Sequence, residues 1–97
     1  MEFLVQFEID IPVGVAESEV KAREDAEAVA AATLADEGHL VRVWRSQTAR
    51  GDAKVLGLYR ANNVQELHDL LVALPLYQWM RVEVTTLEQH PNDPAAS

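Results

Sequence analysis

The chain has 97 residues, a net charge of -8 and no cysteine. A chain of this length predicts a single domain, and the lack of cysteine excludes disulfides, thiolate metal sites and a cysteine nucleophile. The acidic charge argues against nucleic acid or an anionic membrane as a partner, because phosphate groups are bound by basic surfaces.

The first half of the sequence predicts a strand, a helix and a second strand. Apolar residues alternate with mostly polar ones over residues 3–11, which predicts a half-buried strand that ends at the first proline. An alanine-rich segment then predicts a helix that runs to residue 37, with Ser18 as its N-cap and Gly38 just past its end. A second strand is expected over residues 40–46. The N-terminus has no basic region or long apolar segment, so we expect a cytoplasmic protein.

The second half predicts a hairpin and a second helix. Residues 47–54 are typical of a hairpin loop, and a third strand over residues 55–59 follows. Asn62 or Asn63 is expected to cap the next helix, which Pro75 ends. The apolar stripe of this helix is leucine at helical spacing: Leu67, Leu70, Leu71 and Leu74.

A last strand is expected over residues 80–87, and no periodicity follows His90. We therefore expect one α+β domain over residues 1–90 and a C-terminal tail over residues 91–97. The order βαββαβ predicts a ferredoxin-like sandwich, in which two helices cover one face of an antiparallel sheet. Alternation places four apolar residues on the other face, which predicts that two sheets pack together as a dimeric α+β barrel. These residues are Leu4, Trp44, Leu56 and Leu58.

Glu27 is the carboxylate of greatest interest in the first helix. At 3.6 residues per turn it shares one line along the helix with Val20, Arg23 and Leu34. If this line faces the sheet, burial raises the pKa of Glu27 toward the range of a general base. Alternatively, the side that carries Ala22, Ala26, Val29 and Thr33 is buried, and Glu27 pairs with Arg23 in solvent.

Four segments in order along the chain resemble one family. They are Trp44-Arg45, Glu66-Leu67-His68, Leu-Pro-Leu-Tyr-Gln-Trp-Met-Arg-Val-Glu-Val over residues 74–84, and His90-Pro91. The chain is similar to the muconolactone Δ-isomerases, which carry a Leu-Trp-Arg block, a Leu-His pair, a Leu-Pro-Leu-Phe-Pro-Tyr-Met block and a closing His-Pro. The resemblance implies a reaction that converts muconolactone to 3-oxoadipate enol-lactone in aromatic catabolism.

The resemblance also implies roles for particular residues. Counting back from Gly38 places the family's proton-transferring glutamate at Glu27, whereas Glu24, one turn earlier, is its rival. Arg45 or His68 would hold the substrate carboxylate or polarise the lactone carbonyl. The alternatives are a structural arginine and a boundary histidine that binds a carbonyl group.

Aromatic side chains are candidates to line an apolar pocket for a small ring, with core packing as the alternative. These candidates are Trp44, Tyr59, Tyr77 and Trp79. His90 is a further substrate-binding candidate that could cover a pocket in a neighbouring subunit. The three histidines lack metal-site spacing, so we expect no metal, and an enolate stabilised by the lactone carbonyl needs no cofactor.

The chain departs from the family pattern on the third strand, where Val55 and Gly57 stand at positions that are Asn and Ser in the family. This leaves three hypotheses: an isomerase for muconolactone or a related lactone, a non-catalytic binding protein, and a cofactor-free cyclase or oxygenase for a larger ring. The expected partners are the small lactone and further copies of the chain, forming a homodimer and, by family resemblance, a decamer.

Overall fold

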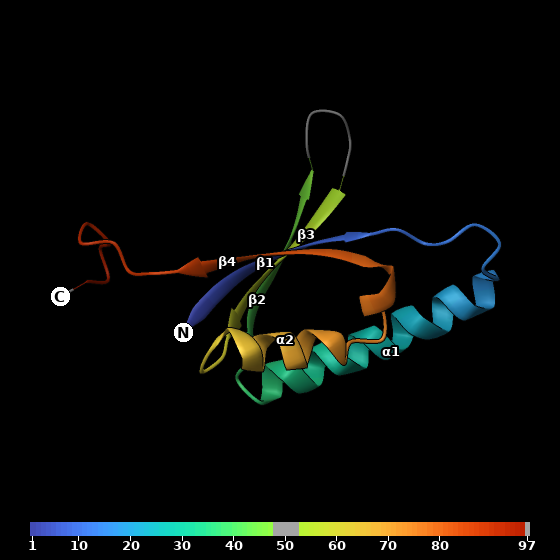
Figure 1. The fold of residues 1–97 in the computed structure, drawn as a ribbon, viewed down its shortest axis with the longest axis horizontal. Coiled ribbons are helices and arrows are strands. Elements are labelled where there is room, and N and C mark those ends of the chain that lie inside the picture. The colour runs from blue at the N-terminus through green and yellow to red at the C-terminus, as the bar shows by residue number, and fades with distance from the viewer. Residues whose placement is uncertain (48–52, 97) are drawn as a thin grey trace.

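The computed structural model describes residues 1–47 and 53–96. Figure 1 shows two helices lying against one face of a four-stranded sheet, which confirms the predicted α+β order. The elements are β1 (Glu2–Ile9), α1 (Glu17–Asp36), β2 (Leu40–Gln47), β3 (Ala53–Arg60), α2 (Val64–Val72), the 3-10 helix η1 (Tyr77–Trp79) and β4 (Met80–Leu87). The sequence did not predict η1, and part of the expected hairpin loop lies outside the described residues.

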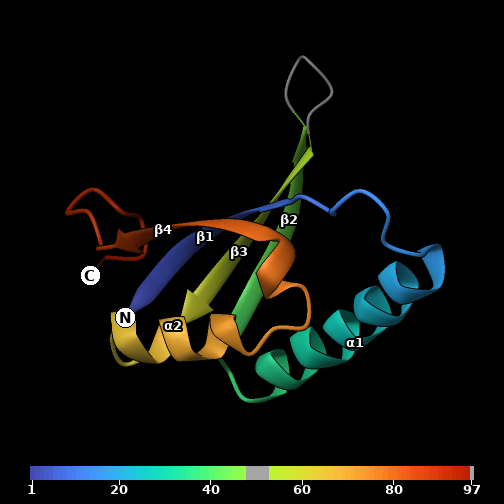
Figure 2. The ribbon, with the colours of Figure 1, turned by 45° about the vertical axis from the view of Figure 1, so that its right-hand side comes forward.

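The sheet is antiparallel throughout and has the order β2-β3-β1-β4. Because side chains alternate across a strand, one set from β1 points toward the helices: Phe3, Val5 and Phe7 are all buried. Across the sheet, Phe3 pairs with Tyr59 and Val5 pairs with Val84. Figure 2 shows that the two helices lie along the same face, with α1 the longer.

The hydrophobic core lies between this face and the helices. The predicted leucine stripe of α2 supplies much of it, since Leu67, Leu71 and Leu74 are buried and Leu70 is half-buried. From α1, Leu34 joins the same cluster. In the described part of the chain, neither helix is long and apolar enough to cross a bilayer.

The ends of α1 show one wrong and one confirmed prediction. The N-cap is Ala16, without a side-chain hydrogen bond, so Ser18 lies inside the first turn. Two glutamates in that turn complement the positive end of the helix dipole instead. At the other end Gly38 adopts φ 80, a left-handed conformation that glycine accepts readily. The N–H of His39 then donates to the Leu34 carbonyl at 2.9 Å, which closes the helix.

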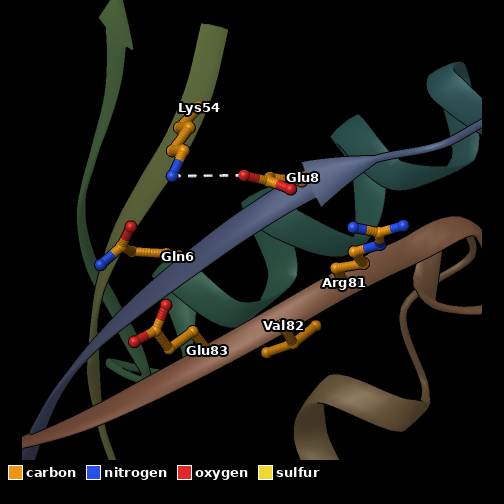
Figure 3. Close-up of a pocket in the computed structure, with 6 residues that line it drawn as sticks. All are labelled: Gln6, Glu8, Lys54, Arg81, Val82 and Glu83. Carbon is orange, nitrogen blue, oxygen red and sulfur yellow. Dashed lines mark ion pairs between the residues drawn. The ribbon is translucent and has the colours of Figure 1, made fainter. Parts of the chain in front are cut away.

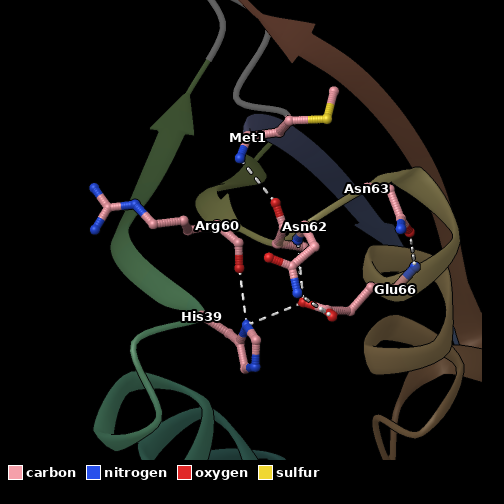
Figure 4. Close-up of polar contacts among 7 residues, drawn as sticks. Met1, His39, Arg60, Asn62, Asn63 and Glu66 are labelled. Carbon is pink, nitrogen blue, oxygen red and sulfur yellow. Dashed lines mark hydrogen bonds and ion pairs between the residues drawn. The ribbon is translucent and has the colours of Figure 1, made fainter.

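The start of α2 is fixed by a polar network with its neighbours (Figure 4). The Asn63 side chain accepts a hydrogen bond from the Glu66 N–H at 2.8 Å, which confirms one of the two expected caps. The Glu66 carboxylate in turn accepts from the Asn62 backbone and side chain at 3.2 and 2.9 Å. His39 donates through Nδ1 to the Arg60 carbonyl at 2.8 Å, so this histidine fastens β3 to the end of α1.

The sheet face opposite the helices has an apolar side and a charged side, which lie next to each other. Leu4 pairs with Leu58, and Trp44 pairs with Leu56, which places all four predicted residues on this open face. The charged side contains a hollow of about 270 Å³ (Figure 3). Its lining includes Gln6, Glu8, Lys54, Arg81 and Glu83, with Lys54 and Glu8 paired at 3.2 Å.

Candidate active site

The face of α1 that carries Glu27 lies toward the sheet. Leu34 is buried, and Arg23, Glu27 and Ala30 are half-buried along the same line. The alternative face is exposed, and Val29 on it retains 68% of its accessible surface. The helical period therefore places the Glu27 carboxylate between α1 and the sheet.

Glu27 lines a cavity of about 180 Å³ between α1 and strands β1, β2 and β3. Among the described residues around this cavity, Glu27 is the only charged one and Tyr59 supplies a phenol. The rest of the lining is apolar and includes Val43, Leu76 and Met80. Such a cavity, with few polar groups in an apolar wall, is typical of a site for a small ring compound.

A second hollow of about 420 Å³ adjoins this cavity, and Glu27, Ile9 and Leu76 line both. Glu24 lines only the second hollow and is exposed. Glu27 therefore lies where the two hollows meet. Of the two glutamates, only Glu27 lines the apolar cavity beneath α1.

Burial raises the pKa of Glu27 above its ordinary value, and a hydrogen bond from the Leu76 backbone N–H to Oε1 at 3.0 Å partly opposes this rise. Burial, together with the neighbouring Glu27 charge, raises the pKa of Tyr59 to about 12. The phenol therefore stays protonated near neutral pH and can donate a hydrogen bond. The pair combines a proton acceptor with a proton donor in one apolar cavity.

Glu27 should make folding stability depend on pH. The pKa of Glu27 is raised in the folded state, so the folded chain binds a proton at Glu27 more tightly than the unfolded chain does. The stability that this proton contributes is therefore lost as pH rises from about 4.5 through the folded pKa. Glu27→Gln keeps an acceptor for the Leu76 N–H without the charge. We expect Glu27→Gln to be more stable than the parent at pH 8 and equal to it at pH 4, measured by urea unfolding. The same difference at both pH values would contradict the burial of a charged carboxylate.

The structure places the other predicted residues at several different locations. Tyr59 lines the cavity with Glu27. Arg45 is exposed and pairs across the sheet with Val55, so it lies on the cavity face of β2. Trp44 lies on the opposite face, where Arg42 stacks over its ring at 5.2 Å.

His68 and Tyr77 lie together in a different hollow, of about 190 Å³, between α2 and β4. This hollow shares none of its described lining residues with the Glu27 cavity. Trp79 is buried, with the Arg23 guanidinium 4.8 Å from its ring centroid. Within one chain, neither His68, Tyr77 nor Trp79 lines the cavity of Glu27.

His90 lies beyond the far end of β4. Met80, at the start of β4, pairs with Ile9 beside the cavity, whereas Leu87 pairs with Glu2 at the other end of β1. The tail continues away from α1 (Figure 1). His90 therefore does not reach the Glu27 cavity of its own chain, and its Nδ1 accepts from the Asn92 N–H at 2.9 Å.

Val55 and Gly57, the two departures from the family pattern, both line the cavity. A Cβ atom on Gly57 would lie 2.6 Å from Cε2 of the Tyr59 ring, so the missing side chain leaves room for this ring. The phenol of Tyr59 thus occupies space that a side chain at position 57 would require.

Gly57→Ala should destabilise the fold by about 1–3 kcal/mol, because the buried Tyr59 ring has to move. Urea unfolding of Gly57→Ala, Tyr59→Leu and the double variant measures the coupling. We expect the Gly57→Ala cost to fall sharply when Tyr59 is already leucine. An unchanged cost would show that the ring does not set the space at position 57.

A family model described as muconolactone delta-isomerase matches residues 1–93 of the chain. The chain belongs to the muconolactone Δ-isomerase family. Muconolactone Delta-isomerase 1 of Acinetobacter lwoffii is 37% identical over 83 residues, which cover 86% of this chain and 79% of that protein. Muconolactone Delta-isomerase of Cupriavidus pinatubonensis is 30% identical over 95 residues, covering 95% and 97%. A crystal structure of muconolactone isomerase superposes with a TM-score of 0.85 at 27% identity, covering 100% of this chain and 98% of that chain.

Membership of the muconolactone Δ-isomerase family confirms the resemblance, the ferredoxin-like fold and the class of enzyme, an isomerase. The binding-protein and oxygenase hypotheses are not favoured by these relatives. The sequence did not indicate the Leu76 N–H as part of the site, because residue type does not show where a backbone N–H group points. It also did not indicate the contacts of Arg23, although this residue lies on the same stripe as Glu27.

Proposed function

We propose that this member of the muconolactone Δ-isomerase family moves a proton between two carbons of a small unsaturated lactone, with Glu27 as the base. The observation that carries the proposal is a carboxylate at the wall of a cavity whose described lining is apolar apart from Glu27 and the Tyr59 phenol. Desolvation raises the pKa of Glu27 and so makes its carboxylate a stronger base than one in water. The substrate is muconolactone or a related lactone.

In the proposed reaction, the Glu27 carboxylate takes a proton from the saturated ring carbon that carries the carboxymethyl arm, which is conjugated through the ring double bond to the lactone carbonyl. The electron pair of the broken C–H bond moves onto the carbonyl oxygen, and an enolate forms. The protonated Glu27 then returns the proton to the ring carbon next to the carbonyl, and the double bond shifts one position away from the carbonyl. Atoms and charge balance within the substrate, so the step needs no oxidant or cofactor.

Two further residues are suited to binding the substrate in this reaction. Tyr59 is protonated and lines the cavity, so its phenol can donate to the developing enolate oxygen. Arg45 lies on the cavity face beside Val55, where a guanidinium can bind a substrate carboxylate. Because Val55 and Gly57 supply no polar side chain, recognition of the ring rests on Glu27, Tyr59 and apolar contact.

The test is turnover of muconolactone by the purified chain, followed by NMR. We expect the enol-lactone product to form at a rate proportional to enzyme concentration. A folded chain that forms no product from muconolactone would exclude it as the substrate, and the related unsaturated lactones in which the carboxymethyl arm is shortened or methylated would be assayed next. Failure with all of them would overturn the isomerase proposal.

We also propose that the chain forms a homodimer through its open sheet face, and that larger rings are built from this dimer in the cytoplasm. Leu4, Leu56, Leu58 and Trp44 supply an apolar area, and the charges beside it are of both signs (Figure 3). A two-fold axis can bring opposite charges together. In such an assembly, the tail with His90 would contact a neighbouring subunit rather than its own cavity.

Leu56→Asp tests this interface by light scattering after size-exclusion chromatography. A carboxylate on the open face should dissociate the dimer, because burying an unpaired charge is costly. Val13→Asp is the matched control, since Val13 is fully exposed and lies between β1 and α1. If both variants keep the parent mass, the sheet face is not the interface.

A further inference from the structure

One peptide unit bridges two charged residues of α1. The Pro75 carbonyl accepts a hydrogen bond from Arg23 Nη1 at 3.1 Å, and the Leu76 N–H donates to Glu27 Oε1 at 3.0 Å. These two groups belong to the same planar peptide, so they point in opposite directions. Arg23 and Glu27 are four residues apart and share the sheet-facing line of α1. The peptide therefore lies between a guanidinium and a carboxylate, one helical turn apart.

Arg23 is held in place by contacts beyond this peptide. Its guanidinium lies over the buried Trp79 ring, 4.8 Å from the centroid. With the Gln78 amide oxygen turned toward it, Gln78 accepts from Nη1 and Nη2 at 2.9 Å each. A weaker ion pair joins Nη2 to Glu19 at 3.5 Å. Arg23 thus fixes the segment from Pro75 through η1 against α1.

We propose that Arg23 is a positioning residue for Glu27, holding the Pro75–Leu76 peptide so that the Leu76 N–H stays directed at the carboxylate. This inference rests on the proposed role of Glu27 as the base. The guanidinium at the carbonyl end also polarises the peptide, which strengthens the N–H as a donor at the other end. A donor of this kind favours the ionised carboxylate, whereas burial favours the protonated one.

Few other charged or titratable groups face Glu27. Tyr59 on β3 lines the same cavity, Arg45 lies on the cavity face of β2, and Glu24 lies one turn back on α1. The cavity-lining residues that β1, β4 and the segment before η1 contribute are apolar: Phe7, Ile9, Met80 and Leu76. The Leu76 N–H is therefore the main described contact that keeps Glu27 in the form a base requires.

Arg23→Met removes the guanidinium that binds the Pro75 carbonyl, and Lys21→Met is the matched control. Lys21 lies on the same helix and carries the same charge, but its side chain is 78% exposed and pairs with Asp25. The first readout is the pH dependence of kcat/KM with muconolactone. At pH values below the optimum, we expect Arg23→Met to lower kcat/KM about tenfold, because one hydrogen bond to a charged group is lost. At high pH, kcat/KM should return to the parent value. Lys21→Met should follow the parent at every pH.

The second readout is the titration of the Glu27 carboxyl by 13C NMR without substrate. We expect its midpoint to move to higher pH in Arg23→Met and to stay in place in Lys21→Met. A uniform loss of activity with an unmoved midpoint would mean that Arg23 only ties η1 to α1, and would overturn the proposal. If Arg23→Met does not fold, Arg23→Gln replaces it, with an upward shift again expected and an unmoved midpoint again contradictory.

The two readouts separate this inference from the proposed function. The NMR titration requires no turnover, so it decides the role of Arg23 even if muconolactone is not the substrate. Conversely, turnover that survives with an unmoved titration midpoint would leave the isomerase proposal intact and remove the role of Arg23.

Discussion

Glu27→Gln should lower kcat/KM for muconolactone by about 10²–10⁴-fold, the usual contribution of a general base. The amide keeps the size of the side chain and an acceptor for the Leu76 N–H, so the cavity should retain its shape. Only the ability to take a proton is lost. Steady-state kinetics with both proteins at saturating and limiting substrate measures the effect, which we expect mainly in kcat.

The control for this change is Glu24→Gln. Glu24 is exposed, lies one turn earlier and lines only the outer hollow. It should keep kcat/KM within a few-fold of the parent. A large loss in Glu24→Gln, together with near-parent activity in Glu27→Gln, would reverse the assignment of the base.

Leu67→Ala should have the largest effect on folding, a loss of about 2–5 kcal/mol in the free energy of unfolding. Leu67 is 1% exposed and belongs to the core cluster between α2 and the sheet. Its truncation leaves a cavity that the surrounding β1 and β4 side chains cannot fill without moving. Because a domain is stable by only about 5–15 kcal/mol, this one change should lower the urea midpoint markedly.

Val72→Ala is the matched control on the same helix, since Val72 retains 42% of its accessible surface. We expect it to change stability by less than about 1 kcal/mol. Leu67 does not line the Glu27 cavity, so the folded fraction of Leu67→Ala should keep kcat/KM near the parent value. Equal destabilisation by the two variants would contradict the assignment of the α2 core face.

The fold was predictable because alternation and helical period are local properties of the chain. Val5 and Leu67 fall on buried faces by these periods alone. Capping was less predictable: Asn63 caps α2, whereas Ser18 does not cap α1, because the backbone turns into the helix two residues before it. Arg23 contacts the Pro75 carbonyl just before η1 and the Trp79 ring within it, and no local sequence pattern predicts these contacts.

The site was predictable only in part. Helical spacing left two faces of α1 as candidates for the buried one, only one of which carries Glu27, and it did not show which strands lie beneath each helix. That depends on the order β2-β3-β1-β4, which puts α1 beside β2 and β3 at the Glu27 cavity and leaves His68 with Tyr77 over β4. The role of the Leu76 N–H was also not predictable, because its direction is set by the Pro75–Leu76 peptide, whose carbonyl group binds Arg23.

The most direct test of Glu27 as the proton carrier is exchange in D2O, followed by NMR on muconolactone and its product. The parent and Glu24→Gln should introduce deuterium during turnover, and Glu27→Gln should introduce none above the uncatalysed rate. Deuterium uptake by Glu27→Gln at the parent rate would contradict the account, because the proton would then be moved by a group other than the carboxylate in this cavity.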